Sequence, residues 1–451
     1  MRHLKIHLTV KVILIIFLLS IPQLLYSQKK SSEKFDITSG LKFRNIGPAI
    51  GGGRVASVVG IPGKPNIYYI GAAGGGVFKT TDGGFSWKPI FEKEPVSSIG
   101  VIALAPSNPN MVWVGTGESN IRNDVLNGKG VYYSPDAGTT WKFMGLKDAG
   151  QISQIVIDPT DPKIVFVAAL GHPWAPNKER GLYKTIDGGK TWKKVLFIND
   201  TTGISDVVMQ PGNSEVMLAA AWQVVRYPWA LEDGGTGSGI YQSKDGGDTW
   251  TKISAGLPKG LLGRISFATS LSQPEHVYAL IESKKGVLWD SHDFGDHWML
   301  VSNNHELNVR PFYFSRMEVA PNDDEKIYFL SFLITVSNNG GKTVKSINKG
   351  IHVDHHAIWI DPKNPERIIE GNDGGVYLSM NAGDSWNFLN NIPIEQFYQV
   401  ALDTSYAYNL GGGLQDNNAW YGPSRNLNGG SVDGSGWFIV AGGDGEYVVP
   451  A

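Results

Sequence analysis

The carboxylates best placed for acid–base chemistry stand in short stretches rich in glycine and asparagine. Glu118 lies in GESNIRNDVLNGK (117–129), Asp373 in GNDGG (371–375) and Asp416 in LQDNN (414–418). Glycoside hydrolysis usually needs two such groups flanking one bond, about 5 Å apart in retaining enzymes and roughly 6.5–9.5 Å apart in inverting ones. We treat these three residues, with Glu179 as a further partner, as weak catalytic candidates, because a sequence gives no separation.

A second set of side chains could hold a ligand without acting on it. Arginine can clamp a carboxylate with two parallel hydrogen bonds, or pair with a neighbouring Asp or Glu of its own chain. Aromatic rings can stack on the apolar face of a sugar, or anchor their own loop. The ligand-binding candidates are Arg54, Arg122, Trp174, Arg180, Tyr227, Trp229, Arg310, His352, Asp354, His355 and His356.

The run HVDHH at 352–356 could also serve a metal. His352, Asp354 and His356 alternate on one side of an extended segment, and imidazole with carboxylate is a donor set that suits zinc. The alternative is a hydrogen-bonded polar cluster at the start of a strand. The chain has no cysteine, which excludes disulfides, thiolate zinc sites and a cysteine nucleophile. We expect no bound metal and no cofactor.

The elements that position these residues are set by a repeated phrase, Ser/Thr-x-Asp-x-Gly-x-x-Trp. Asn replaces Asp in the last two copies, and Val replaces Trp in the sixth. A fixed repeat of about 40–60 residues indicates a propeller, a solenoid or an array. The seven copies occupy residues 80–87, 134–141, 185–192, 243–250, 291–298, 337–344 and 379–386.

Each repeat predicts four short antiparallel strands. In the second repeat, alternating apolar residues predict strands at 99–105, 111–115, 131–134 and 140–143, separated by the turns PSNP and PDAG. Such units repeated seven times predict an all-β propeller of about seven blades. Residues 392–451 begin a further repeat, which could close the ring, form an eighth blade or start a second propeller.

The repeated phrase itself is best explained as scaffold. Its Asp can accept backbone N–H groups within its own turn, its Gly permits the tight bend, and its Trp buries a large apolar area. Asn339 and Asn381 can make the same turn bond, so we expect those blades to be looser but intact.

An antiparallel meander sorts the turns into two groups. The turns between the first two strands and between the last two share one face, which carries every copy of the phrase. The connections between the second and third strands, and between successive blades, share the opposite face. All of the candidate residues lie in these latter connections, so we expect them to surround one mouth of the central channel.

The N-terminal segment and the composition indicate where the protein is located and which partners it can bind. Residues 1–27 read as a signal peptide, with basic Arg2 and Lys5 before the apolar VILIIFLL and small Ser27 at the cleavage point. We therefore expect a secreted or periplasmic protein with no membrane span after cleavage. Residues 28–44 form an extension and 45–391 the propeller. A net charge of −2 without a basic block argues against nucleic-acid binding.

The phrase resembles the Asp-box, or bacterial neuraminidase repeat. Over residues 45 to about 450 the chain is similar to secreted bacterial proteins related to the sortilin N-terminal propeller, and more distantly to xyloglucanases and sialidases. The Asp-box is specific for the fold but not for activity, because enzymes, receptors and binding modules share it.

The xyloglucanase resemblance implies a catalytic Asp in the first repeat and another in a second propeller. The matching stretch here is AAGGG (72–76), which places Ala73 where the carboxylate would stand, and the second propeller is missing from this chain. The early Phe/Tyr-Arg-Ile-Pro phrase of sialidases is only vaguely echoed by FRNI at 43–46, and no local phrase assigns their arginine triad. We therefore predict a non-catalytic propeller that binds a peptide or a glycan, with a glycoside hydrolase of atypical carboxylate pair as the alternative.

Overall fold

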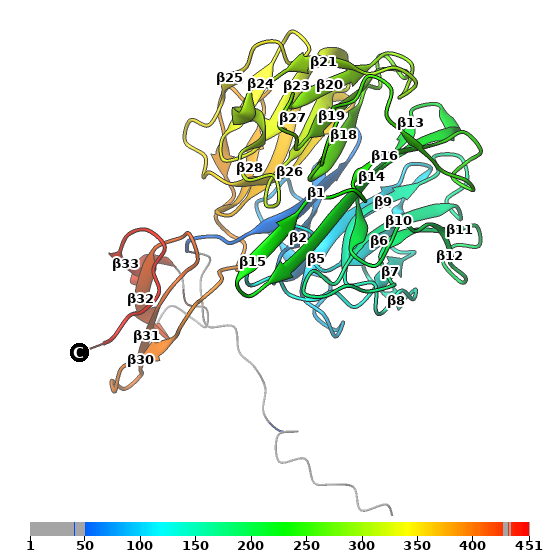
Figure 1. The fold of residues 1–451 in the computed structure, drawn as a ribbon. Helices are drawn as coiled ribbons and strands as arrows, with labels where there is room; N and C mark the ends of the chain where they lie inside the picture. The colour runs from blue at the N-terminus through cyan, green and yellow to red at the C-terminus, as the bar shows by residue number, and fades with distance from the viewer. Residues whose placement is uncertain (1–39, 41–49, 427–431, 433, 451) are drawn as a thin grey trace, which may run out of the picture. The chain divides into compact units, whose positions relative to one another are not determined.

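The computed structural model describes residue 40 and residues 50–426, 432 and 434–450 (Figure 1). The predicted signal peptide, the 43–46 stretch and nearly all of the predicted extension lie outside these residues. The regular secondary structure of the described part is almost entirely β, with two single-turn 3-10 helices, η1 (His305–Asn308) and η2 (Gly434–Gly436). It contains no helix long and apolar enough to cross a membrane.

Seven consecutive antiparallel sheets form seven blades, and within each blade the strand order follows the chain. Blade 1 contains β1 (Val55–Ile61), β2 (Lys64–Ala72), β3 (Gly76–Thr80) and β4 (Lys88–Pro89); blade 2 contains β5 (Ile99–Ala105), β6 (Asn108–Thr116), β7 (Val131–Ser134) and β8 (Lys142–Phe143); blade 3 contains β9 (Gln151–Ile157), β10 (Val165–Gly171), β11 (Gly181–Thr185) and β12 (Lys193–Leu196).

Blades 4 to 7 continue the pattern, and blade 4 carries one additional strand. Blade 4 contains β13 (Thr202–Gln210), β14 (Asn213–Tyr227), β15 (Ala230–Asp233), β16 (Gly239–Ser243) and β17 (Thr251–Ile253); blade 5 contains β18 (Ile265–Thr269), β19 (Val277–Ile281), β20 (Leu288–Ser291) and β21 (Met299–Ser302); blade 6 contains β22 (Arg316–Ala320), β23 (Asp323–Leu330), β24 (Ile334–Ser337) and β25 (Lys345–Ser346); blade 7 contains β26 (His355–Asp361), β27 (Asn364–Asn372), β28 (Gly375–Ser379) and β29 (Asn387–Phe388).

The seven blades close into a ring. The first strand of each blade contacts the first strand of the next, and β26 of blade 7 returns to β1 of blade 1. The hydrophobic core is correspondingly divided into seven layers, one between each pair of neighbouring blades. In the layer that closes the ring, Val55 and Tyr68 of blade 1 pack with Ala357 and Ile369 of blade 7. The predicted propeller is confirmed.

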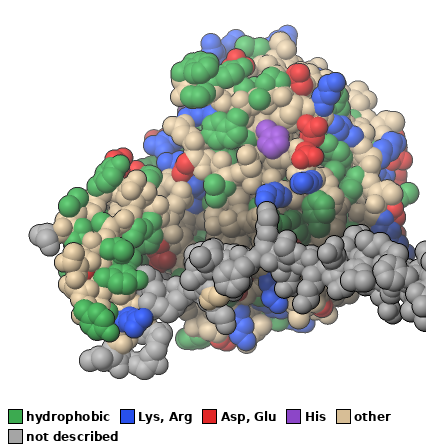
Figure 2. All heavy atoms as spheres, turned by 90° about the horizontal axis from the view of Figure 1, so that it is seen from below, with side chains coloured by type: hydrophobic (Ala, Val, Ile, Leu, Met, Phe, Trp, Pro, Cys, Tyr) green, Lys and Arg blue, Asp and Glu red, His purple; other side chains and the backbone are tan. Residues whose placement is uncertain are grey.

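An eighth sheet follows the ring. It contains β30 (Ala401–Leu402), β31 (Asn409–Gly413), β32 (Ala419–Pro423) and β33 (Phe438–Ala441). None of its residues belongs to the seven layers between blades, so residues 401–441 are not needed to close the ring. Many of its apolar side chains are exposed, including Leu402, Tyr408 and Phe438, and hydrophobic atoms gather on this sheet in the space-filling view of Figure 2.

The repeated phrase forms turns, which we call the Asp-box turns, that are fixed by closely similar hydrogen bonds in every blade. In blade 1, the Thr80 hydroxyl donates to Asp82 and accepts from the Gly84 N–H, while Asp82 accepts from the N–H and the hydroxyl of Ser86. The bonds from Ser86 stabilise the carboxylate and lower the pKa of Asp82 to about 2. Asn339 and Asn381 accept the equivalent backbone bonds from Thr343 and Ser385, so these turns are intact.

A second recurring bond joins each Asp-box to the turn between the first two strands of its own blade. It runs from the Gly83 N–H to the Asn66 carbonyl in blade 1 and from the Gly188 N–H to the Lys163 carbonyl in blade 3, with counterparts in the other five blades. The two turns therefore lie at the same end of the strands. We call this end the Asp-box face and the other end the binding face.

One connection on the binding face, at residues 223–238, contains an additional hairpin. There β14 continues to Tyr227 and pairs with β15. The extension is stabilised because Trp222 and Val224 are buried in an apolar cluster with Ile121, Leu170 and Phe312. We call this the cap cluster.

The buried hydroxyl of the Asp-box gives a direct test of its structural role. In blade 3 the Thr185 hydroxyl accepts from the Gly189 N–H at 2.9 Å and donates to Asp187. Thr185→Val keeps the shape but leaves a buried N–H without a partner, which should lower the free energy of unfolding by about 1–3 kcal/mol. Thr185→Ser, the residue found in five of the other copies, should change it little. Urea unfolding of both variants measures the difference, and equal stability would contradict this account.

Candidate functional site

A buried aspartate, Asp373, lies at the centre of the binding face. It occupies the turn between β27 and β28, and its side chain is almost completely enclosed. The Nε2 of His356 lies 2.8 Å from its Oδ1, the hydroxyl of Tyr313 lies 2.5 Å from its Oδ2, and the Nη1 of Arg122 lies 3.6 Å from the same oxygen. Side chains from three other segments thus converge on one carboxylate.

The electrostatic balance keeps Asp373 ionised. Burial by itself would raise its pKa, but attraction and hydrogen bonding by His356, with further support from Arg54 and Tyr313, lower the pKa well below its ordinary value. Burial also lowers the pKa of His356, so this ring is neutral. Since an ionised carboxylate only accepts hydrogen bonds, the His356 proton lies on Nε2 and the Tyr313 hydroxyl is the donor.

Two further aspartates flank this centre. The carboxylate oxygens of Asp354, Asp373 and Asp416 all lie within 4.8 Å of one another. Burial, followed by repulsion from Asp373, raises the pKa of both Asp354 and Asp416 to about 6. Arg122 offsets part of the repulsion, because its Nη1 lies 3.5 Å from Asp416 as well as 3.6 Å from Asp373. Three carboxylates and one guanidinium therefore form a compact cluster, which we call the Asp373 cluster.

The backbone at this cluster is strained. Asp354 and Asp416 have φ of 66° and 60°, and the neighbouring Arg310 has φ of 52°. These left-handed values are uncommon for residues other than glycine. Strain of this kind persists only where the surrounding structure enforces it, and it concentrates at functional sites. The two flanking aspartates therefore combine an unfavourable backbone conformation with repulsion from the nearby carboxylate of Asp373.

The predicted candidate Glu118 has a different role. It is 1% exposed and binds Arg54 through two parallel hydrogen bonds of 2.9 and 3.1 Å. Arg54 is itself buried, and its Nη1 donates to Tyr313 at 3.0 Å. Both side chains are occupied by each other and by Tyr313, so this geometry favours a supporting role over the catalytic acid and the ligand clamp expected from the sequence. The pair supports the Asp373 cluster from beneath.

Three other predicted contacts are also buried within the protein. Arg180 is fully enclosed and donates to the carbonyls of Leu170 and His172, so it fixes its own loop. His355 uses both ring nitrogens, on Glu370 and Asn348. His356 holds Asp373, as described above. These side chains cannot contact a ligand, and the prediction fails because burial of loop residues is not visible in the sequence.

The alternating His352, Asp354 and His356 do not form a metal centre. The Nε2 of His356 faces Asp373, and the Nδ1 of His352 lies 2.7 Å from the carbonyl oxygen of Val353. The nitrogens therefore do not converge on one point with Asp354. The polar-cluster alternative describes this segment.

The aromatic candidates lie on and beside the β14–β15 hairpin. The rings of Tyr227 and Trp229 stack with centroids 5.6 Å apart, and Trp229 is 82% exposed. Trp174 is half-buried in the adjoining loop, which accepts a hydrogen bond from the Arg226 N–H through the carbonyl of Pro173. The cap cluster beneath the hairpin contains Ile121 and Phe312, the chain neighbours of Arg122 and Tyr313. The hairpin is thus connected to the Asp373 cluster through packed side chains.

A pocket of about 330 Å³ opens beside the cluster. Its wall includes Arg54, Glu118 and Asp124 together with residues 73–75 of blade 1 and 393–396. Arg122 borders it, because its Nε lies 3.9 Å from Asp124. This volume is at the lower end of the range for small-ligand sites. Ala73, at the position where the xyloglucanase resemblance would place a carboxylate, lies in this wall.

Sequence reasoning missed Tyr313, which binds three members of the site. Its hydroxyl accepts from Arg54 and Arg122 at 3.0 Å each while it donates to Asp373. The available signal was its position three residues after Arg310, in a connection between blades that the topology assigns to the binding face. A tyrosine among apolar neighbours gives no indication of polar contacts, so its role emerges only from the fold.

Comparison with known proteins agrees with this architecture. The family model for sortilin, or neurotensin receptor 3, matches residues 128–257. Xyloglucanase Xgh74A of Acetivibrio thermocellus is 26% identical over 361 residues, covering 74% of this chain and 39% of that enzyme. The crystal structure of the GH74 xyloglucanase from Xanthomonas campestris superposes with a TM-score of 0.60 at 17% identity, covering 83% of this chain and 59% of the other. The structure of YCF48 bound to D1 peptide gives a TM-score of 0.50 at 13% identity, covering 75% and 97%.

The chain is a sortilin- and xyloglucanase-like β-propeller. The structural likenesses establish the fold and not the activity, since their identities are low. The chain also spans well under half the length of the xyloglucanase that it matches. Its function must therefore be argued from its own site.

The raised pKa of Asp416 predicts a pH-dependent stability. A folded-state pKa near 6, against an ordinary value near 3.8, means that the stabilising proton is fully held below about pH 4 and lost as pH rises through 6. Asp416→Asn removes this pH-dependent loss of stability, and asparagine tolerates the positive φ at this position. The variant should therefore be more stable than wild type by about 2 kcal/mol at pH 8, with the difference vanishing near pH 4. Urea unfolding at the two pH values tests this, and a constant difference would contradict it.

Proposed function

We propose that the protein is a secreted, non-catalytic propeller that binds a glycan on its binding face. The single observation that carries the proposal is the Asp373 cluster, where partly exposed Arg122 and Asp416 are held in fixed positions beside a pocket. Side-chain exposures of 26% and 22% leave both groups accessible to a ligand. The exposed Trp229 ring on the adjoining hairpin supplies an apolar surface.

The chemistry of the cluster suits a hydroxyl-rich ligand. The guanidinium of Arg122 offers donors, while Asp354 and Asp416 offer acceptors a few ångströms away. A sugar hydroxyl both donates and accepts, so adjacent hydroxyls can bridge such a pair. Tyr313 and Asp373 hold Arg122 in place, which lowers the entropy cost of ordering this side chain on binding. An aromatic ring such as Trp229 packs on the apolar face of a sugar.

Three observations argue that the bound glycan is not cleaved. Ala73 cannot transfer a proton, Glu118 is fully paired with Arg54, and Asp373 is 2% exposed and surrounded by its own partners. A nucleophile or a base must reach the anomeric carbon or its attacking water. Of the carboxylates considered as catalysts, Asp416 alone combines exposure with a raised pKa.

The relatives support a glycan and leave a peptide as the competing ligand. Sequence similarity to a xyloglucanase extends over 74% of the chain, and the name of that enzyme identifies its substrate as the polysaccharide xyloglucan. The superposed YCF48 structure holds a peptide, but the likeness there concerns the fold alone. A cluster of alternating donors and acceptors favours the glycan.

Glycoside hydrolysis is the second candidate, because Asp373 and Asp416 are close and differ in protonation. Their oxygens lie within 4.8 Å, near the separation of about 5 Å seen in retaining enzymes, and their environments shift their pKa values in opposite directions. Paired carboxyl groups of this kind can divide the roles of acid and base. This reading requires Asp373 to become accessible when a substrate binds.

A matched pair of aromatic substitutions tests binding on this face. Trp229→Ala should weaken glycan affinity about tenfold, roughly 1.4 kcal/mol, because the stacking surface is lost. Phe85→Ala removes an aromatic ring that is 88% exposed on the Asp-box face, and it should leave affinity unchanged. A glycan array identifies the ligand and calorimetry measures both variants. Equal affinities, or binding of peptides instead of glycans in a parallel peptide library, would overturn the proposal.

A hydrolysis assay separates the two candidates. Wild-type protein is incubated with the bound glycan and with xyloglucan, and products are followed by mass spectrometry at pH 5 and pH 7. The proposal expects no products. Product formation that disappears in Asp416→Asn would instead establish the hydrolase, since that variant removes the proton of the exposed carboxyl group.

A further inference from the structure

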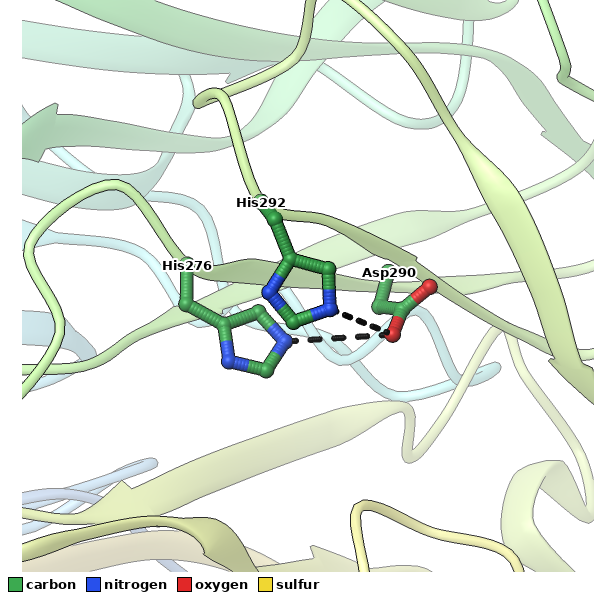
Figure 3. Close-up of side chains that lie close together, drawn as sticks. All are labelled: His276, Asp290 and His292. Carbon is green, nitrogen blue, oxygen red and sulfur yellow. Dashed lines mark ion pairs between the residues drawn. The ribbon is translucent and has the colours of Figure 1, made fainter.

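Two histidines and an aspartate converge on the Asp-box face of blade 5, far along the strands from the site described above. His276 immediately precedes β19, Asp290 lies in β20, and His292 lies in the fifth Asp-box (Figure 3). The register of β19 and β20 pairs Val277 with Ser291 and Tyr278 with Asp290. One step further along the ladder, His276 faces His292, and alternation along each strand puts Asp290 on the same side.

The three side chains point their ligand atoms at one another. The Oδ2 of Asp290 lies 3.8 Å from the Nε2 of His276 and 3.5 Å from the Nε2 of His292, and all three ligand atoms lie within 4.8 Å of one another. In a tetrahedral zinc site with bonds near 2.0–2.1 Å, ligand atoms are separated by roughly 3.3 Å. Movements of a few tenths of an ångström to about 1.5 Å would therefore suffice to bring these three atoms around one ion.

Two buried polar atoms in this group have no hydrogen-bond partner. They are the Nε2 of His276 and the Oδ1 of Asp290. His276 is 4% exposed and its Nε2 is aimed at the other two side chains (Figure 3). An unsatisfied buried polar atom is unusual in a native protein, and an ion is one of the few things that explain it.

The environment of His276 also matches that of a metal ligand. Its Nδ1 lies 2.8 Å from the Oδ2 of Asp324, which comes from β23 of the neighbouring blade. A carboxylate that accepts the Nδ1 proton orients the ring and leaves the Nε2 lone pair free to bind a metal. His292 is 60% exposed, so an ion can reach the site from solvent.

We propose that His276, Asp290 and His292 bind a divalent transition-metal ion of the zinc type, with Asp324 as a positioning residue. Imidazole nitrogen with carboxylate oxygen suits zinc, and three protein ligands leave a coordination position for water or another ligand. The competing occupant is a proton, because a doubly protonated His276 would also fit between Asp290 and Asp324. Binding of a metal requires His292 as a ligand, whereas a proton on His276 does not require His292.

Calorimetric titration of the untagged full chain with ZnCl2 tests the site. Wild type should bind one Zn²⁺ saturably, and His292→Ala should weaken this binding at least tenfold. His297→Thr is the matched control: it removes another exposed histidine from the same turn and installs a residue type that other Asp-boxes carry there, so Zn²⁺ affinity should not change. Asp324→Asn should weaken binding by roughly 10–100-fold.

Cobalt absorbance provides a second readout. Co²⁺ added to the wild type should give visible bands of a nitrogen- and oxygen-ligated ion, and Zn²⁺ should displace them. Circular dichroism before titration shows that each variant is folded. Absence of saturable binding in folded wild type, or equal Zn²⁺ affinity for His292→Ala and His297→Thr, would overturn the proposal. Either result leaves the glycan proposal unaffected, because that site lies at the opposite ends of the strands.

Discussion

The alternating direction of four strands is the constraint on which the rest of this molecule depends. It sends two turns of every blade to one face and two connections to the other. The recurring hydrogen bond from each Asp-box to the first turn of its blade fixes the Asp-box face seven times over. The connections of the binding face lie outside the repeated phrase. They are therefore free to vary in length and sequence, and the largest insertion, at 223–238, becomes a hairpin only because the cap cluster gives Trp222 and Val224 a place to pack.

Within the binding face, the buried charge of Asp373 organises the other groups. A carboxylate enclosed to this degree is tolerable only with several partners, and His356, Tyr313 and Arg122 supply them from blade 7, the connection before blade 6, and blade 2. Burial, together with repulsion from this charge, raises the pKa of Asp354 and Asp416, so these two carboxyl groups are harder to ionise. Positive φ at both neighbours adds a conformational cost. Natural proteins commonly accept such costs where a ligand is bound.

The sequence predicts the fold in detail and the site in part, for a physical reason. Strands 99–105 and 131–134 appear with those bounds, because alternation and turn residues are local signals. Membership of the binding face follows from strand direction, and the Nη1 of Arg122 lies 3.6 Å from Asp373 and 3.5 Å from Asp416. Whether a side chain is buried, and which group it pairs with, depends on segments that are distant in the sequence. The pairing of Glu118 with Arg54 spans 64 residues, and that of Tyr313 with Asp373 spans 60, so neither is readable from a local pattern.

Because the phrase is repeated, residues that depart from it in a single copy can be compared with the other copies. In the fifth Asp-box, His297 stands where other copies have Ser or Thr, yet its Nδ1 still lies 2.6 Å from Asp293 and preserves the turn. His292 stands at a position where the copies differ freely, and its ring turns to Asp290 and stacks with His276 at 4.0 Å instead of supporting the turn. Two histidines in one phrase thus have separate explanations. The first is a structural replacement, while the second is unnecessary for the fold, and its alignment with an unsatisfied buried nitrogen calls for a ligand.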